Sequence, residues 1–458
     1  MTGLDLTRRK FIGNCCAAVG ATGILSALAQ LRVIGAVAAD TSGGDYKALV
    51  CLFLYGGNDS NNVIIPYDSA GYASYAAQRT ALAIAQESLL PITPKTYSDG
   101  RQYALHPSLV EVQGLFAQGQ LGFLANTGTL TYPTTLTQYN SGTANLPPQL
   151  FSHADQQVQW QSSIPDQPFQ TGWGGRLADV ISALNSNSAI SMSISLAGQN
   201  SFQVGNVVSQ YAVSPSGAVT LNGTTGGAIN PIRYSTQLDL LNQQEANLFQ
   251  AAFSNLTSSA ISDATLLNSV LANAATLTTT FPTTSLGSQL QMIARLISAA
   301  PALGLNRQIF FASLGGFDTH TVELATQAPL LVQVSQALSA FYNATVELGV
   351  AGQVTAFTAS DFSRTYNTNG NGADHGWGSH HLIMGGAVAG GDIYGKMPSL
   401  LLGGPDDTGR GRWIPSTSVD QYSATLASWF GVSPANLPVV LPNIGRFPTD
   451  NLGFMNGT

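Results

Sequence analysis

The amino-acid sequence predicts an α/β fold in which helices flank a mostly parallel, doubly wound central sheet. Short apolar runs, each followed by small residues and then by a polar cluster, lie at 48–55, 121–125, 308–314 and 354–359. Continuous apolar runs of this length are typical of strands that are buried on both faces. Helical patterns lie between the runs, and alternation of strand and helix indicates a largely parallel sheet.

Three segments repeat apolar residues at three- and four-residue spacing, which predicts helices at 108–117, 286–299 and 325–347. The region from about 183 to 283 differs, because Ser, Asn, Thr, Gln and Ala dominate it. Its first part predicts short hairpins, and its part after about 236 predicts helix. We interpret this region as a polar insertion or cap on one domain that spans residues 40–458.

The N-terminus has the pattern of a twin-arginine signal peptide. Residues 7–12 read TRRKFI, an uncharged stretch rich in Ala, Gly and Leu follows, and small residues end it at 36–39. A charged start, an apolar middle and a small-residue cleavage site indicate a secretory signal, and the Arg-Arg pair indicates the twin-arginine route. An ordinary secretory signal or an uncleaved anchor is the alternative. We expect residues 1–39 to be removed after the twin-arginine translocase exports the folded chain to the periplasm or beyond.

Composition excludes some classes of function. Residues 1–39 hold Arg8, Arg9, Lys10, Arg32 and Asp5, so 13 of the 17 basic and 23 of the 24 acidic side chains remain after them, a net charge of −10. Such a chain lacks the basic face that nucleic acid requires. No later segment is long and apolar enough to predict a membrane span. One cysteine remains after the signal, so no intrachain disulfide is expected.

Aspartates and histidines follow the predicted strands, where ligands bind in open α/β sheets. Aspartates with neutral histidines form the mixed oxygen and nitrogen ligand set of zinc, manganese or similar ions. Two such ions about 3.5–4 Å apart can clamp the attacking and leaving oxygens of an ester. We therefore expect a divalent metal, with zinc, manganese and calcium as candidates. The predicted ligands are Asp59, Asp318, His320, Asp361, Asp374 and His375.

Several of these residues have a structural alternative. Asp59 lies in a GGND turn and is also a candidate Asx-turn or helix cap. Asp361 can equally form a local salt bridge with Arg364. Of His380 and His381 we expect at most one to face the site. The predicted substrate-binding residues are Asn62, His153, Arg364 and His380.

The predicted nucleophile is Ser152, which lies in the segment SHAD at an expected helix start. The simpler interpretation is that Ser152 caps this helix. The positive end of a helix dipole would also favour an oxygen nucleophile or bind an anion. Thr127 and Thr129 are weaker alternatives. No G-x-S-x-G motif and no phosphate-binding loop occurs, which disfavours an ordinary α/β-hydrolase and a P-loop enzyme.

Several motifs in fixed order resemble one bacterial family. They include CLFLYGGNDSNNVIIPY, GFLANTGTL, FSHADQQ, GGFDTH, TASDFSRT, ADHGWGSHH and LIMGGAVAGGDIYG. Together they resemble the uncharacterised family called domain of unknown function 1501, whose members carry twin-arginine signals. That family is in turn similar to the alkaline phosphatase and sulfatase superfamily, which implies an alkaline phosphatase-like doubly wound sheet with metal ligands at its strand ends.

The resemblance also implies roles for individual residues. It assigns metal ligands to Asp59, Asp318, His320, Asp361 and His375, and the nucleophile's place to Ser152. Two departures stand out. Phe362 occupies the position after the second-site aspartate, where the superfamily has histidine or asparagine, and the spacing from Asp318 to His320 is shorter than usual. These departures imply that one metal site is altered, reduced to a single ion or lost.

The leading hypothesis from sequence is therefore an exported, metal-dependent hydrolase of phosphate or sulfate esters, acting on a small molecule or a polymer. The runner-up is a non-catalytic extracytoplasmic protein that uses the same crevice for binding or surface assembly. A metal-free serine hydrolase built on Ser152 and a histidine is a third class, and it lacks a supporting motif.

Overall fold

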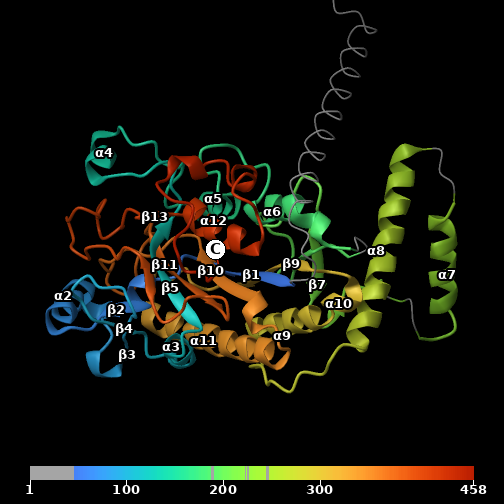
Figure 1. Cartoon of the computed structure of the whole chain (residues 1–458), viewed down its shortest axis with the longest axis horizontal. Helices are drawn as coiled ribbons and strands as arrows, with labels where there is room; N and C mark the ends of the chain where they lie inside the picture. Colours follow the sequence, from blue (N-terminus) through green and yellow to red (C-terminus); the bar gives the residue numbers. More distant parts are fainter. Residues whose placement is uncertain (1–45, 187–189, 222, 224–225, 244–246, 458) are drawn as a thin grey trace, which may run out of the picture. The chain divides into compact units, whose positions relative to one another are not determined.

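A ten-stranded mixed sheet forms the centre of the protein in the computed structural model (Figure 1). The structure describes residues 46–457 apart from 187–189, 222, 224–225 and 244–246, so the predicted signal peptide lies outside the described residues. The strands lie in the order β12 (Ile393–Gly395), β5 (Leu121–Gly128), β11 (Ser379–Gly385), β10 (Val354–Ser360), β1 (Lys47–Leu54), β9 (Arg307–Leu314), β6 (Ser193–Ser195), β7 (Tyr211–Ser214) and β8 (Gly217–Ala218), with β13 (Thr417–Ser418) beside β5.

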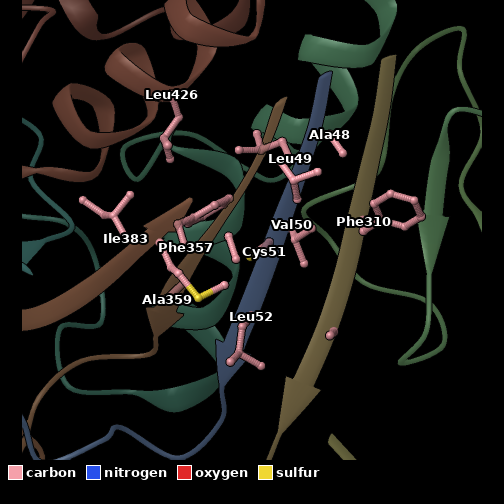
Figure 2. Packing of buried hydrophobic residues seen from close by; sticks show 14 of the residues in the cluster. Ala48, Leu49, Val50, Cys51, Leu52, Phe310, Phe357, Ala359, Ile383 and Leu426 are labelled. Atoms are coloured by element: carbon pink, nitrogen blue, oxygen red, sulfur yellow. The ribbon is translucent and has the colours of Figure 1, made fainter. Parts of the chain in front are cut away.

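The middle of this sheet is parallel and buried on both faces. Strand β1 pairs in parallel with β10 and β9, and Val50 lies beside Ala356 on one side and Phe310 on the other. Consecutive residues of β1 are buried although they point to opposite faces of the sheet (Figure 2). Strand β11 runs antiparallel between β10 and β5. All four apolar runs of the sequence thus form central strands, as predicted.

Helices cover both faces of the sheet, which confirms the predicted α/β class. Figure 1 shows α3 (Val110–Ala117), α9 (Ser285–Ser298) and α11 (Glu323–Glu347) on one side of it. Helices α5 (His153–Ser162), α6 (Trp173–Ile181) and α12 (Val419–Phe430) lie on the other side. The start of α12 is fixed by a capping box between Ser418 and Gln421. The three helices predicted from apolar spacing are α3, α9 and α11.

The region expected to be an insertion or cap is only partly one. Strand β6 pairs in parallel with β9 and therefore belongs to the central sheet. Strands β7 and β8 form the expected hairpin at its edge, and the expected helices are α7 (Asn230–Leu241) and α8 (Leu248–Ala272). The sequence Ser-Ile-Ser of β6 has no apolar run to mark it as a sheet strand.

Smaller elements complete the described chain. A second, antiparallel sheet has the order β2 (Ile64–Pro66), β4 (Tyr103–Leu105) and β3 (Leu90–Ile92), and the short helices are α2 (Ser69–Arg79), α4 (Leu136–Ser141), α10 (Ala300–Leu303) and α13 (Leu437–Val440). Among the helices of the described residues, none is long and apolar enough to cross a membrane. Because β1, β9 and β10 are parallel, the loops that leave their carboxyl ends meet at one edge.

Candidate metal centre

Three side chains at this edge lie close enough to hold one metal ion. One ligand atom from each of His153, Asp318 and His375 lies within 4.8 Å of the other two. His153 begins α5, Asp318 follows β9, and His375 lies in the long loop between β10 and β11. A fourth residue, His320, joins them, since its Nε2 lies 2.8 Å from His375 Nε2 and 3.2 Å from Asp318 Oδ1.

The ε nitrogens of the three histidines converge on one oxygen of Asp318. Besides His320 Nε2, the Nε2 atoms of His153 and His375 lie 3.5 and 3.8 Å from Asp318 Oδ1. The guanidinium of Arg364 donates to the same oxygen at 2.5 Å. Although burial opposes the shift, this hydrogen bond lowers the pKa of Asp318 below its usual value. The carboxylate is therefore ionised at neutral pH and can only accept.

The δ nitrogens of the same histidines each face an acceptor. His375 Nδ1 lies 2.6 Å from the carbonyl oxygen of Phe151, which can only accept, so this nitrogen carries the proton. His153 Nδ1 lies 2.7 Å from Asp361 Oδ2, and His320 Nδ1 lies 3.1 Å from Asp374 Oδ1. With its proton on Nδ1, each neutral ring directs the lone pair of Nε2 toward Asp318. Histidines that bind metals are held in this way.

This arrangement calls for a cation. Three lone pairs and a carboxylate oxygen facing one another repel, and His153 Nε2 is buried without a hydrogen-bond partner. Either a proton or a metal ion can relieve the repulsion. Burial lowers the pKa of His375, and although the hydrogen bond to Phe151 opposes that shift, the nearby His153 adds to it. Protonation is thus disfavoured at His375, and the donor set fits a divalent metal.

Asp361, a predicted ligand, lies behind His153 instead of beside Asp318. Its Oδ2 faces His153 Nδ1 and also accepts from Gln157 Nε2 at 2.8 Å, and its Oδ1 accepts from the Gly56 amide at 3.2 Å. No salt bridge to Arg364 is found within the described part of the chain, because that arginine pairs with Asp318. In this geometry Asp361 orients His153 and faces the ring nitrogen opposite the one that faces Asp318.

Asp374 has the same relation to His320. It faces His320 Nδ1, accepts from Asn369 Nδ2 at 3.2 Å and forms an ion pair with Arg410 at 2.5 Å. Partial burial opposes the shift, but the hydrogen bonds from Asn369, Arg410 and His320 lower the pKa of Asp374 to about 2. The ionised Asp374 therefore keeps the proton of His320 on Nδ1. Asp374, like Asp361, orients a histidine in the structure.

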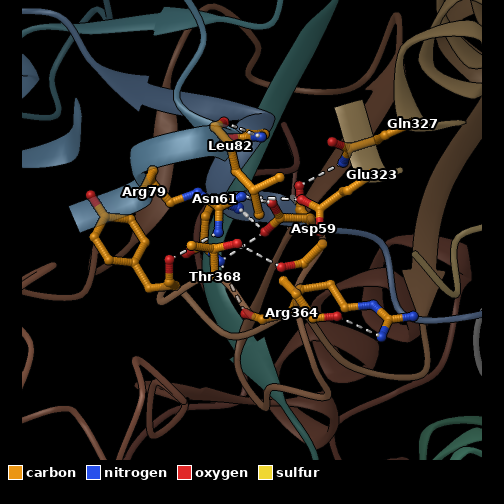
Figure 3. A network of polar contacts seen from close by, with 12 residues as sticks. Asp59, Asn61, Arg79, Leu82, Glu323, Gln327, Arg364 and Thr368 are labelled. Carbon is orange, nitrogen blue, oxygen red and sulfur yellow. Dashed lines mark hydrogen bonds and ion pairs between the residues drawn. The ribbon is translucent and has the colours of Figure 1, made fainter. Parts of the chain in front are cut away.

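Asp59 lies in a buried polar network that also includes Arg79, Glu323 and Arg364 (Figure 3). Its carboxylate accepts from the Asn61 amide at 3.1 Å and forms an ion pair with Arg79, which also lies 3.1 Å from Glu323. The alternative that Asp59 caps a turn is thus confirmed. Burial raises the pKa of Glu323 to about 9. The negative charge of Asp59 adds to this shift, and the positive charge of Arg79 opposes it. One negative charge therefore balances Arg79 at neutral pH.

Three of the predicted substrate-binding residues are buried and hydrogen-bonded to other parts of the protein, although His380 Nε2 has no partner among the described residues. Asn62 Oδ1 accepts from the Tyr75 hydroxyl, and Arg364 donates to four backbone carbonyls in addition to the Asp318 carboxylate. His380 is buried in β11, and its Nδ1 accepts from the Asn126 amide at 2.9 Å. His381 packs on Trp160. Neither His380 nor His381 belongs to the group around Asp318.

Ser152 immediately precedes α5, as predicted. Its hydroxyl donates to Asp155 Oδ2 at 2.5 Å and makes no capping bond to the backbone. The preceding residue, Phe151, has a φ of 71°, which is strained for an aromatic side chain. That conformation accompanies the contact of the Phe151 carbonyl with His375. Ser152 is therefore joined to the histidine group through its neighbours on both sides.

Sequence reasoning assigned His153 to substrate, and the structure brings it together with Asp318 and His375 in the group that could hold a metal ion. It also overlooked Arg79, Glu323 and the carbonyl of Phe151. His153 could have been recognised in the sequence by its position. It lies next to the candidate nucleophile, at a helix start that faces a strand-end aspartate.

A family model described as a protein of unknown function, DUF1501, matches residues 46–409. Comparison with curated proteins gave no match. Among solved structures, the PsFucS1 sulfatase from Pseudoalteromonas sp. is similar, with 9% identity and a TM-score of 0.36 over 90% of this chain and 73% of that one. Ps i-CgsB in complex with k-i-k-neocarrahexaose has 8% identity and a TM-score of 0.34 over 86% and 74%. Ps i-CgsB alone has 8% identity and a TM-score of 0.35, over 88% of this chain and 77% of that one.

The different positions of Asp318 and Asp361 can be tested by metal affinity. We expect Asp361→Asn to weaken divalent metal binding about 10–100-fold while one ion still binds at saturation, because the change disturbs only the orientation of His153. Asp318→Asn should abolish binding. Titration calorimetry with zinc and with manganese measures both. Complete loss of binding in Asp361→Asn would show that this carboxylate is itself a ligand.

The buried network around Arg79 predicts how stability depends on pH. Folded Glu323 keeps its proton up to about pH 9, whereas the unfolded carboxyl loses it near 4.5, so this group makes the free energy of unfolding fall as pH rises between these values. The slope for one proton is at most about 1.4 kcal/mol per pH unit. Glu323→Gln should flatten the fall, and the exposed Glu87→Gln should not. Urea unfolding from pH 6 to 9 tests this, and parallel curves for all three proteins would contradict it.

Proposed function

The chain belongs to the DUF1501 family, and we propose that it is an exported, metal-dependent hydrolase of phosphate or sulfate esters. The observation that carries the proposal is the convergence of the Nε2 atoms of His153, His320 and His375 on Asp318 Oδ1. A structural ion pair would not require three histidines whose protons are all held on the opposite side of the ring.

The ligand set limits the identity of the ion. Three imidazole nitrogens and one carboxylate oxygen suit zinc, manganese or a similar transition metal. Calcium, which takes six to eight oxygen ligands, fits less well. A single group of four ligands also agrees with a one-metal site. The side chains of Asp318 and His320 are 50% and 43% exposed, so a substrate can approach from their side.

A metal bound here would supply Lewis acidity to an ester oxygen. The chain itself supplies the arrangement around it. Asp361, Asp374 and the Phe151 carbonyl hold protons on the far side of the three histidines. Arg364 fixes the carboxylate of Asp318. These groups are in place before any substrate binds, which avoids the cost of reorganising them during the reaction.

Ser152 is the proposed nucleophile. Its hydroxyl donates to Asp155, so this carboxylate can take the proton as the serine oxygen attacks phosphorus or sulfur. The bond from that atom to the alcohol oxygen of the ester then breaks, and the protonated Asp155 can give the proton to the departing alcohol. The oxygen also lies at the amino end of α5, where the helix dipole favours negative charge. Water would then attack the same phosphorus or sulfur atom, the bond to the serine oxygen would break, and phosphate or sulfate would leave.

A non-catalytic binding protein is the second candidate. It is favoured by the state of Arg364, whose guanidinium is buried and fully engaged by carbonyls and Asp318 and so cannot bind the anion of an ester. In that case the metal centre would bind a ligand or hold the strand-end loops without turnover.

Metal content and turnover decide between these functions. We expect the purified protein, free of histidine tags, to contain or take up about one equivalent of zinc or manganese per chain, because four ligands converge on one point. Asp318→Ala should lose both the metal and turnover on a panel of aryl phosphates and sulfates. The exposed Asp450→Ala is the matched control and should lose neither.

The possible outcomes separate the candidates. Elemental mass spectrometry measures the metal content. If the protein takes up no metal after reconstitution, the metal-dependent hydrolase is ruled out. Stoichiometric metal without turnover on any phosphate or sulfate ester supports the binding role.

The role of Ser152 has a separate test. Ser152→Ala should lower kcat by roughly a thousandfold or more, as loss of a nucleophile does, and should leave metal stoichiometry unchanged. Asp155→Asn should lower kcat as well, because Asp155 accepts the serine hydrogen bond. Turnover by Ser152→Ala at the wild-type rate would mean that water attacks directly.

A further inference from the structure

Helix α8 carries large apolar side chains in solvent. Leu248, Phe249, Phe253 and Leu256 are 85%, 88%, 66% and 71% exposed. Figure 1 shows α8 beside α7, and α7 adds the exposed Ile232 and Leu240, with the exposed Ile229 directly before it. Single exposed apolar residues are ordinary, but a group on one helix marks an interaction surface.

The exposed residues of α8 have the spacing of a helix–helix seam. Phe249, Phe253, Leu256 and Ala260 follow one another at steps of four, three and four residues, and all four are exposed. Steps of this kind place side chains along the stripe that faces a partner in a coiled coil. We call these four residues the α8 stripe. The next position at the same spacing is Asp263, whose charge ends the stripe.

The two halves of α8 differ in shape. Its first two turns carry Leu248, Phe249 and Phe253 in solvent, whereas hollows border the helix from Leu256 onward. One hollow of about 310 Å³ is lined by Val219, Leu221, Tyr234, Ala260, Ile261 and Ala264, among others. Another of about 470 Å³ lies between α8 and the sheet edge, and Ala260 borders it too. The stripe therefore runs from large side chains to a small residue beside open space.

Charge favours a protein over a lipid surface as the partner. Helix α7 holds one basic residue, Arg233, and α8 holds none. Helices that bind membrane surfaces usually carry several lysines or arginines, and this chain as a whole has a net charge of −7. A nearly neutral helical pair meets no electrostatic repulsion from a second copy of itself.

We propose that α8 pairs in antiparallel fashion with α8 of a second copy of this chain. A twofold axis between Phe253 and Leu256 places Phe249 opposite Ala260 of the partner subunit and Phe253 opposite Leu256 of the partner subunit. Every member of the stripe then meets another member, the large Phe249 meets the small Ala260, and the contact is repeated by symmetry. The two helical pairs together form a four-helix arrangement that buries the exposed residues.

Light scattering and sedimentation velocity of the purified protein test the proposal. The wild type should be a dimer at micromolar concentration, because the stripe buries apolar area in both copies. Phe253→Glu should weaken the dimer at least tenfold, since it places a carboxylate inside the seam. Ser262→Glu puts the same charge on the opposite, exposed face of α8 and should leave the dimer unchanged. Metal content should be equal in all three proteins.

A crosslinking experiment tests the register itself. In the proposed pairing, Leu256→Cys lies close enough to its copy for a short bismaleimide to join two chains, whereas Ser262→Cys does not. The natural Cys51 is buried. A wild type that stays monomeric at 100 µM, a dimer insensitive to Phe253→Glu, or equal crosslinking of both cysteine variants overturns the proposal. Co-flotation of monomer with phosphatidylcholine vesicles overturns it in favour of a lipid surface.

Discussion

The guanidinium of Arg364 ties together the loops that leave three strands of the sheet. It donates to the carbonyls of Gly56 and Gly57 after β1, to Phe317 and Asp318 after β9, and to Ala373 in its own loop after β10. The loops approach so closely that a Cβ on Gly56 would lie 2.4 Å from the Asp318 nitrogen. Since the position of Asp318 depends on this one cation, so does the point on which the histidines converge.

A second buried arginine holds the same edge from the side of the small sheet. Arg79, the last residue of α2, contacts Asp59 after β1 and Glu323 at the start of α11. Its charge is balanced by one carboxylate, because burial keeps the other protonated at neutral pH. Both buried arginines thus fix loops. Neither guanidinium is exposed to solvent, so an anion at this edge would meet the histidine group around Asp318 and the start of α5 instead.

Local sequence predicted the strands β1, β5, β9 and β10, because their apolar runs need no tertiary information, but it did not predict β11 or the small sheet. It also predicted which edge holds the polar cluster. It could not separate ligands from the residues behind them. Asp361 follows β10 as Asp318 follows β9, and only the position of α5, set by packing across the sheet, decides that Asp361 meets His153. The same limit hid the pairing of Asp59 with Arg79, twenty residues later on α2.

The metal centre and its supporting groups act in opposite directions on the stability of the edge. Phe151 is held in a left-handed conformation while its carbonyl contacts His375, and the lone pairs around Asp318 repel one another in the absence of a cation. Arg364 and Asp361 oppose this cost by tying the loops in place. An ion that binds only the folded chain would remove the repulsion and add its binding free energy to folding. In the proposed metal centre the histidines are therefore arranged for the ion at the expense of the metal-free fold, as expected where position matters more for function than for stability.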